Sequence, residues 1–113
     1  MGALSIRFQA EPVRSLAFGS IGAGYTGVGT VLDHPIRQFI IQNLTDATVM
    51  FSLDGINDHF PLPAGGLLID DVSSNQSHSA QGWYVAQGTR LYVKQLGVPS
   101  AGSVYFSVFY GAE

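Results

Sequence analysis

The C-terminal segment of the chain, residues 103–110, alternates like a β-strand but carries large apolar side chains on both faces. One face is apolar at every position, with Val104, Phe106, Val108 and Tyr110. The opposite face carries Tyr105 and Phe109 together with two serines. Because successive side chains of a strand point to opposite sides, this strand needs protein on both of them. The chain is therefore expected to form packed sheets and to present an apolar surface to a partner.

Charged residues are scarce, since Asp, Glu, Lys and Arg make up 12% of the 113 residues, against about 25% in an ordinary soluble domain. A free monomer of this size usually covers itself with charge. The surface is therefore expected to be covered by copies of the chain or by a larger assembly, which indicates a structural role. The five basic residues form no stripe that would neutralise phosphates, so nucleic-acid binding is not expected. No apolar run approaches the roughly 18 residues of a membrane-spanning helix, so no membrane partner is expected.

Strand and turn signals run through the whole sequence, and no segment has the periodicity of a long helix. Fourteen glycines favour many tight turns. Strands are expected at residues 13–20, 28–32, 36–42, 47–53, 59–62, 67–70, 83–86, 90–95 and 103–110. A spacing of roughly 8–12 residues is typical of sandwiches and small barrels. The sequence predicts an all-β fold, a single-domain β-sandwich or jelly roll of about eight short antiparallel strands.

The first residues differ from the rest and are expected to form an N-terminal arm, residues 1–12, ahead of a β-sandwich domain at residues 13–113. In the arm, Ile6 and Phe8 alternate with polar residues until Glu11 and Pro12 interrupt the run. Such an arm can pair with a sheet edge of its own chain or of a neighbour. The chain has no cysteine, so neither a disulfide nor a thiolate metal site is expected.

Three patterns have the residue types of a ligand site but not its context. Residues 22–27 match Gly-x-Gly-x-x-Gly, but the β-branched residues and Pro35 that follow are incompatible with the helix of a dinucleotide site. Residues 54–58 carry three side-chain oxygen donors without the spacing of a calcium loop, so a turn is favoured. The histidines lie in separate segments, at His34, His59 and His78. We therefore expect no catalytic residue, no cofactor and no metal, and an enzyme is the least favoured class.

Aromatic side chains are the remaining candidates for binding. Trp83, Tyr84 and the tyrosines at 25, 92, 105 and 110 are able to stack on sugar rings, which keeps a carbohydrate-binding module as an alternative. Most of them alternate with other apolar residues, so a protein core or interface is favoured. The candidate interface residues are Ile6, Phe8, Tyr25, Tyr105 and Phe109.

Four segments occur in an order that points to a known class. Residues 39–55 combine a strand, an Asn-x-Thr-Asp turn, a second strand and Asp-Gly, and residues 60–66 contain Leu-Pro-Ala-Gly. Residues 88–94 read Gly-Thr-Arg-Leu-Tyr-Val-Lys, and residues 102–110 fit Gly-x-Val-x-x-x-Val-x-Tyr. Over residues 36–111, this order resembles that of small β-sandwich virion proteins of tailed bacteriophages.

The resemblance implies a symmetric, many-copy particle component that is located in the virion and has no enzymatic activity. The favoured role is a capsid decoration (cement) protein that binds the particle surface as a symmetric oligomer. Its expected partners are copies of itself and other virion proteins such as the major capsid protein. A head–tail neck or tail component, and a carbohydrate-binding module in host recognition, are the alternatives. The resemblance carries over no catalytic residue.

Overall fold

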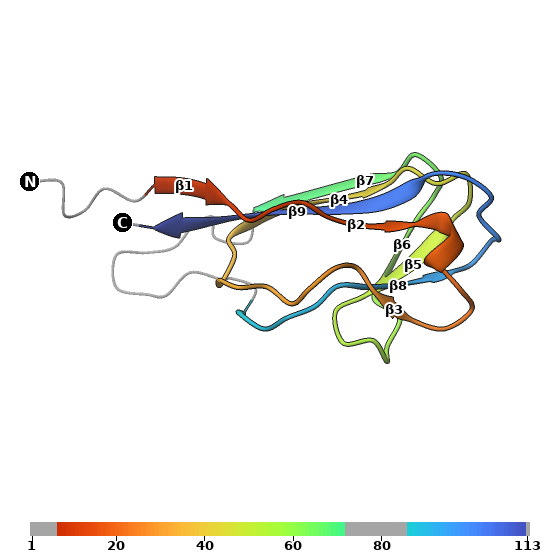
Figure 1. Ribbon diagram of the computed structural model, residues 1–113, viewed down its shortest axis with the longest axis horizontal. Coiled ribbons are helices and arrows are strands. Elements are labelled where there is room, and N and C mark those ends of the chain that lie inside the picture. Colours follow the sequence, from red (N-terminus) through yellow and green to blue (C-terminus); the bar gives the residue numbers. More distant parts are fainter. Residues whose placement is uncertain (1–6, 72–85, 113) are drawn as a thin grey trace, which may run out of the picture.

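The computed structural model describes residues 7–71 and 86–112, which are arranged as β-strands and loops (Figure 1). Its strands are β1 (Arg7–Ala10), β2 (Arg14–Ala17), β3 (Thr26–Gly27), β4 (Gln38–Asn43), β5 (Val49–Ser52), β6 (Phe60–Leu62), β7 (Leu67–Asp71), β8 (Tyr92–Gln95) and β9 (Ser103–Ala112). A single 3₁₀ turn in the described part, η2 (Phe18–Ser20), follows β2. The predicted all-β fold is confirmed.

The strands form two sheets that lie one above the other (Figure 1). The five-stranded sheet has the order β1–β9–β4–β7, and β2 pairs with β9 as well. The four-stranded sheet has the order β3–β8–β5–β6. Every strand pair in both sheets is antiparallel. Strand β9 is the longest strand described, and it pairs with β1, β2 and β4, so it organises the larger sheet.

The core fills the space between the two sheets. Its buried apolar side chains come from both sheets and from the loop segments before β3, β4 and β8: Ile21, Val28, Leu32, Ile36, Ile41, Val49, Phe51, Leu91, Val93, Val104, Phe106 and Val108. In β9 the buried positions are 104, 106 and 108, as alternation predicts, whereas Tyr110 is half-buried, and Val104 and Val108 are fully covered. The apolar area removed from water by such a core is the main source of stability.

One predicted strand is not formed, and a second lies almost entirely outside the described residues. Residues 28–32 form no strand, because Gly29 adopts a left-handed backbone conformation with φ +69° and breaks the run. Val28 N–H still donates to Leu91 C=O at 2.7 Å, and Leu32 N–H donates to Thr89 C=O at 2.8 Å, so the segment closes the sandwich without regular pairing. The predicted strand at 83–86 lies outside the described residues, except for Ala86, which is not in a strand.

A β-bulge joins β1 to β2 along one edge of β9. Ala10 pairs with Phe109 and Arg14 pairs with Phe106, so residues 11–13 lie opposite only residues 107–108. One additional residue in a strand changes which face each later side chain occupies. Glu11 and Arg14, which strict alternation would place on opposite faces, are both buried. The predicted interruption at Glu11 and Pro12 is therefore a bulge, and residues 7–10 of the predicted arm pair with β9 of the same chain.

Candidate functional site

The outer face of the five-stranded sheet carries a group of apolar side chains that are not part of the core. Tyr105 and Phe109 lie on this face of β9, because their neighbours Val104, Phe106 and Val108 point into the core. Both residues are half-buried. The sequence-based separation of β9 into an inner and an outer face is thus the one that the structure adopts.

Strand register adds three apolar residues to the same face. Tyr105 pairs with Gln42, which pairs with Leu67, and Ser107 pairs with Ile40, which pairs with Ile69. Leu67 is 52% exposed and Ile69 is 56% exposed. We call Ile40, Leu67, Ile69, Tyr105 and Phe109 the outer face. Gln42 and Ser107 lie between them, so these two rows contain no charged residue.

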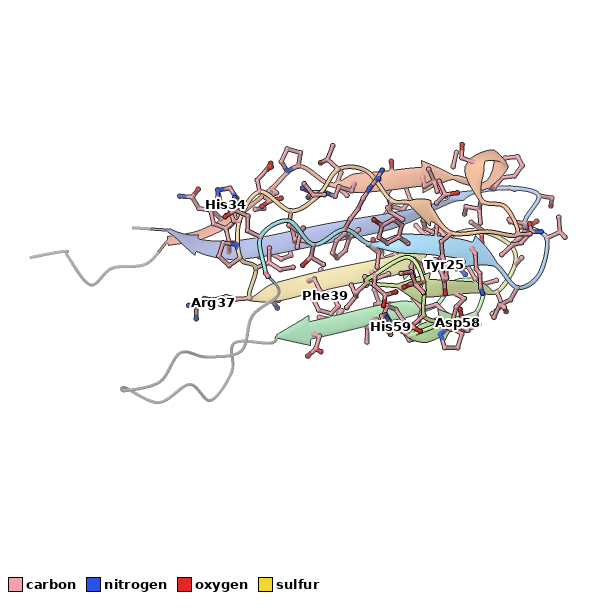
Figure 2. The ribbon with its side chains drawn as sticks, turned by 90° about the horizontal axis from the view of Figure 1, so that it is seen from below. Tyr25, His34, Arg37, Phe39, Asp58 and His59 are labelled. Atoms are coloured by element: carbon pink, nitrogen blue, oxygen red, sulfur yellow. The ribbon has the colours of Figure 1, made fainter. Side chains whose placement is uncertain are left out.

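The opposite side of β4 shows why this face is distinct from the core. Phe39, next to Ile40, packs edge-to-face on Phe106 with ring centroids 6.2 Å apart, and it belongs to the set packed against the core. Figure 2 labels Phe39 among the side chains of this sheet. The two faces of β4 therefore differ in burial, because Ile41 is buried and Ile40 is only half-buried.

The other predicted interface residues lie elsewhere. Phe8 is in β1, where its backbone pairs with that of Gly111, but its side chain lies outside what the structure describes. Ile6 is outside the described residues altogether. Tyr25 precedes β3 and belongs to the smaller sheet's side of the molecule (Figure 2). The structure therefore places Tyr105 and Phe109 on the same face of β9, two rows apart, and Tyr25 beside the smaller sheet.

Tyr25 takes part in a small polar group that we call the loop cluster, formed with Asp58 and Lys94. Its hydroxyl donates to Asp58 Oδ1 at 2.6 Å, and Lys94 Nζ lies 2.9 Å from the same oxygen. Lys94 Nζ also lies 4.8 Å from the centre of the Tyr25 ring, in a cation–π contact. Burial, and then the hydrogen bond to Asp58, raise the pKa of Tyr25 to about 12. The hydrogen bonds from Tyr25 and Lys94 lower the pKa of Asp58.

The neighbouring acidic segment has the geometry of a turn. Asp54 Oδ1 accepts the backbone N–H groups of Ile56 and Asn57, both at 2.8 Å, and Asp54 Oδ2 accepts the Asn57 side-chain amide. These backbone bonds, followed by the side-chain bonds from Asn57 and Ser52, hold the pKa of Asp54 well below its usual range. Both carboxylate oxygens thus accept local donors. No group of three potential metal ligands occurs among the residues that the structure describes.

The bulge creates a second polar group, the bulge cluster, which consists of Glu11, Arg14, His34 and Tyr110. Arg14 Nη2 donates to Glu11 Oε1 at 2.6 Å, and only 6% and 2% of these two side chains are exposed. His34 Nδ1 lies 2.7 Å from Glu11 Oε2, and the His34 ring stacks on Tyr110 with centroids 3.7 Å apart. An ionised carboxylate only accepts hydrogen bonds, so Nδ1 is the protonated nitrogen of this pair. Figure 2 labels His34 near one end of the sandwich.

Glu11 is ionised in this setting because its hydrogen bonds outweigh its burial. Burial opposes ionisation, but the hydrogen bonds from His34, Arg14 and the Asp33 backbone lower the pKa of Glu11 below its ordinary value of 4.5. Arg14 is held further by Nε, which donates to Thr30 C=O at 2.9 Å, and by Nη2, which donates to Val31 C=O at 2.9 Å. The cluster therefore ties the bulge to the segment that precedes β4.

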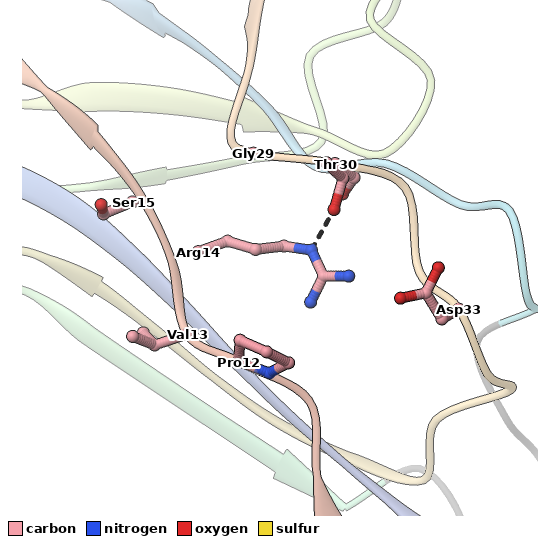
Figure 3. Close-up of a pocket in the computed structure, with 7 residues that line it drawn as sticks. All are labelled: Pro12, Val13, Arg14, Ser15, Gly29, Thr30 and Asp33. Carbon is pink, nitrogen blue, oxygen red and sulfur yellow. Dashed lines mark hydrogen bonds between the residues drawn. The ribbon is translucent and has the colours of Figure 1, made fainter.

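A cavity of about 290 Å³ lies beside this cluster. Residues 12–15 line one side of it, and Gly29, Thr30 and Asp33 line the other (Figure 3). Figure 3 shows the Arg14 guanidinium between these two walls, with its bond to Thr30. Arg14 Nη1 is buried and has no hydrogen-bond partner. Sequence reasoning did not find this site, because the bulge that turns Glu11 and Arg14 to one side is visible only when β1 and β2 are aligned on β9.

Comparison with protein-family models, with curated proteins and with solved structures found no match to this chain. No helix in the described part is long and apolar enough to cross a membrane. The Gly-x-Gly-x-x-Gly segment at residues 22–27 ends in strand β3, where a dinucleotide site would need a helix.

Proposed function

We propose that this chain is a non-enzymatic structural protein of a bacteriophage virion, and that it acts as a capsid decoration protein. The observation that carries the proposal is the outer face, where Ile40, Leu67, Ile69, Tyr105 and Phe109 form an apolar surface on one side of a sheet. The scarcity of charge and the sequence resemblance described above support the same role.

The physical basis of docking is the burial of apolar area. Each square ångström of apolar surface removed from water contributes about 25 cal/mol before the cost of association is subtracted. Leu67 and Ile69 are more than half exposed, and Gln42 and Ser107 between the apolar residues are neutral. A partner with a flat apolar surface therefore covers the rows through Tyr105 and Ser107 without desolvating a charge, whereas the row through Phe109 continues to Gln38 and Asp71. The protein shell of the particle, built from the major capsid protein, is the proposed partner.

The alternative of a carbohydrate-binding module needs an aromatic ring with an open face. Tyr25 does not offer one on the side that Lys94 covers, where Nζ lies 4.8 Å from the ring centre. Its hydroxyl is also committed to Asp58. The geometry of this tyrosine therefore gives the carbohydrate alternative no support.

The test uses particles made from the genome that encodes the chain. The chain is expected among the proteins of purified particles, and purified chain is expected to sediment with particles assembled without it. Ile69→Asp and Tyr105→Asp on the outer face should weaken this binding at least tenfold, because each places a charge in an apolar contact. Ile56→Asp is the matched control, since Ile56 is 80% exposed in the turn after β5.

Circular dichroism establishes that each variant is folded before its binding is compared. Absence of the chain from purified particles would overturn the virion proposal. Equal loss of binding in Ile56→Asp and Ile69→Asp would overturn the assignment to the outer face.

A further inference from the structure

One edge of β2 has backbone groups that pair with no other residue in the described part of the chain. In the described structure β2 pairs only with β9, and Phe18 N–H donates to Gly102 C=O at 3.0 Å. Backbone groups alternate in direction along an antiparallel strand. The N–H and C=O groups of Leu16 and Arg14 therefore point toward β9, as the N–H of Phe18 does. Ser15 and Ala17 therefore direct their N–H and C=O groups away from β9.

Within the four residues of β2, this edge has no exposed charge, proline or bulge. Natural sheets protect edges with charged side chains, proline, bulges or a covering segment. In β2 the side chains of Ser15 and Ala17 are small, neutral and exposed, and the charge of Arg14 is buried. Protection begins only outside the strand, with the bulge at residues 11–13 and the turn η2. A stretch of four residues is left available for pairing.

The cavity beside the edge requires an acceptor. Arg14 Nη1 is buried without a partner, whereas Nε and Nη2 both donate to backbone carbonyls. A buried donor without a partner costs free energy that an incoming acceptor recovers. The carboxylate of Glu11 already balances the charge of Arg14, and Asp33 lines the same cavity. The surroundings therefore favour a neutral acceptor such as a main-chain carbonyl over an anion.

We propose that β2 pairs with β2 of a second copy of this chain, antiparallel and about a two-fold axis at Leu16. This inference rests on the proposed function, for which it names the contact that forms the symmetric oligomer. Ser15 of each copy then lies opposite Ala17 of the other, and their outward backbone groups form the ladder. The two five-stranded sheets join into one continuous sheet across the axis.

The same axis supplies the missing acceptor. With Leu16 on the axis, residues 18–20 of the second copy lie opposite residues 12–14, beside the cavity of the first. Backbone carbonyls of that η2 turn are the acceptors that this arrangement offers to Arg14 Nη1, which becomes accessible to them only as the contact forms. Because one patch provides both the cavity and the carbonyls, the contact is self-complementary, as a two-fold interface requires. A second copy is for this reason preferred over an unrelated peptide.

The test is sedimentation equilibrium of the full chain over a range of concentrations. The wild type should approach twice the monomer mass, and Ser15→Pro should raise the dimer dissociation constant at least tenfold. Proline at residue 15 removes only an N–H that points away from β9, so the fold should persist, as circular dichroism will show. Ala10→Pro is the matched control, because Glu11 N–H donates to Val108 C=O and the N–H of the exposed Ala10 in β1 therefore points away from β9, outside β2. Ala10→Pro should leave the constant unchanged.

Amide hydrogen exchange provides the second measurement. The Ser15 and Ala17 amides should become protected as concentration rises, and the Arg14 guanidinium protons should exchange more slowly in the dimer. A chain that is monomeric at every concentration, or a dimer that Ala10→Pro dissociates and Ser15→Pro does not, would overturn the edge contact. The proposed function would survive that result if the monomer still binds particles through the outer face, so the two failures are distinguishable.

Discussion

The molecule places a carboxylate, a cation and a tyrosine together twice, and the two groups differ in burial. In the bulge cluster the side chains of Glu11 and Arg14 are 2% and 6% exposed, whereas in the loop cluster those of Asp58 and Lys94 are 49% and 25% exposed. The nitrogen–oxygen distances are similar, at 2.6 Å and 2.9 Å. Water screens the exposed pair and leaves the buried pair dependent on its partners. The two ion pairs thus have similar nitrogen–oxygen distances, but we expect the loss of a cation to destabilise the fold more in the bulge cluster than in the loop cluster.

The largest effect is expected from breaking the buried pair. Arg14→Met should destabilise the fold by about 3–5 kcal/mol, because Glu11 would be left as a buried carboxylate without its cation. Urea unfolding followed by fluorescence measures the change. The matched control, Lys94→Met in the loop cluster, should leave the unfolding midpoint nearly unchanged. Equal losses in the two variants would contradict the comparison.

A smaller loss is expected at Gly29, whose backbone supports the bulge cluster. A Cβ at this residue would lie 2.8 Å from Arg14 Cβ, and φ is +69°, so Gly29→Ala should cost about 1–3 kcal/mol. Gly65 has a similar φ of +76° with nothing within 4 Å of its Cβ position. Gly65→Ala therefore isolates the backbone cost, and it should be the milder variant in the same unfolding assay. The reverse order would show that Arg14 does not restrict this position.

The comparison also predicts a pH dependence. The pKa of Glu11 is lowered in the folded state, so its carboxylate contributes stability fully above the unfolded value of about 4.5 and loses it as the pH falls through the folded pKa. Unfolding curves of the wild type and Glu11→Gln should therefore converge as the pH falls below about 4.5. A difference between the two proteins that stays constant from pH 7 to pH 3 would contradict this assignment.

The smallest effect is expected in the loop cluster. Asp58→Asn removes the charge next to the Tyr25 hydroxyl, so the pKa of Tyr25 should fall from about 12 toward its ordinary value of 10.0. Ultraviolet difference titration of the phenol measures this change, with little effect on stability at neutral pH. Burial also raises this pKa, so the shift should be reduced and not abolished. An unchanged titration would show that burial alone is responsible.

Local patterns predicted several features of the site and fold. The spacing of apolar runs and glycines identified the strands that become β4 to β9, and alternation along β9 separated Tyr105 and Phe109 from the core positions. The run at residues 28–32 was predicted wrongly, because β-branched residues favour a strand but the left-handed backbone of Gly29, packed on Arg14, ends it. Strand propensity reflects only the preference of each residue for extended backbone. It carries no information about the packing of Gly29 against Arg14 in a distant strand.

The sequence by itself determined the class of fold and the two-sided apolar character of β9, because both depend on periodicities of a few residues. Only the tertiary structure decided which residues join Tyr105 on the outer face, since Leu67 reaches it through the register of β4 with two neighbours. Only pairing with β9 likewise reveals the additional residue that turns Glu11 and Arg14 to the same side. Register and bulges are relations between strands far apart in the chain, so no single segment encodes them alone.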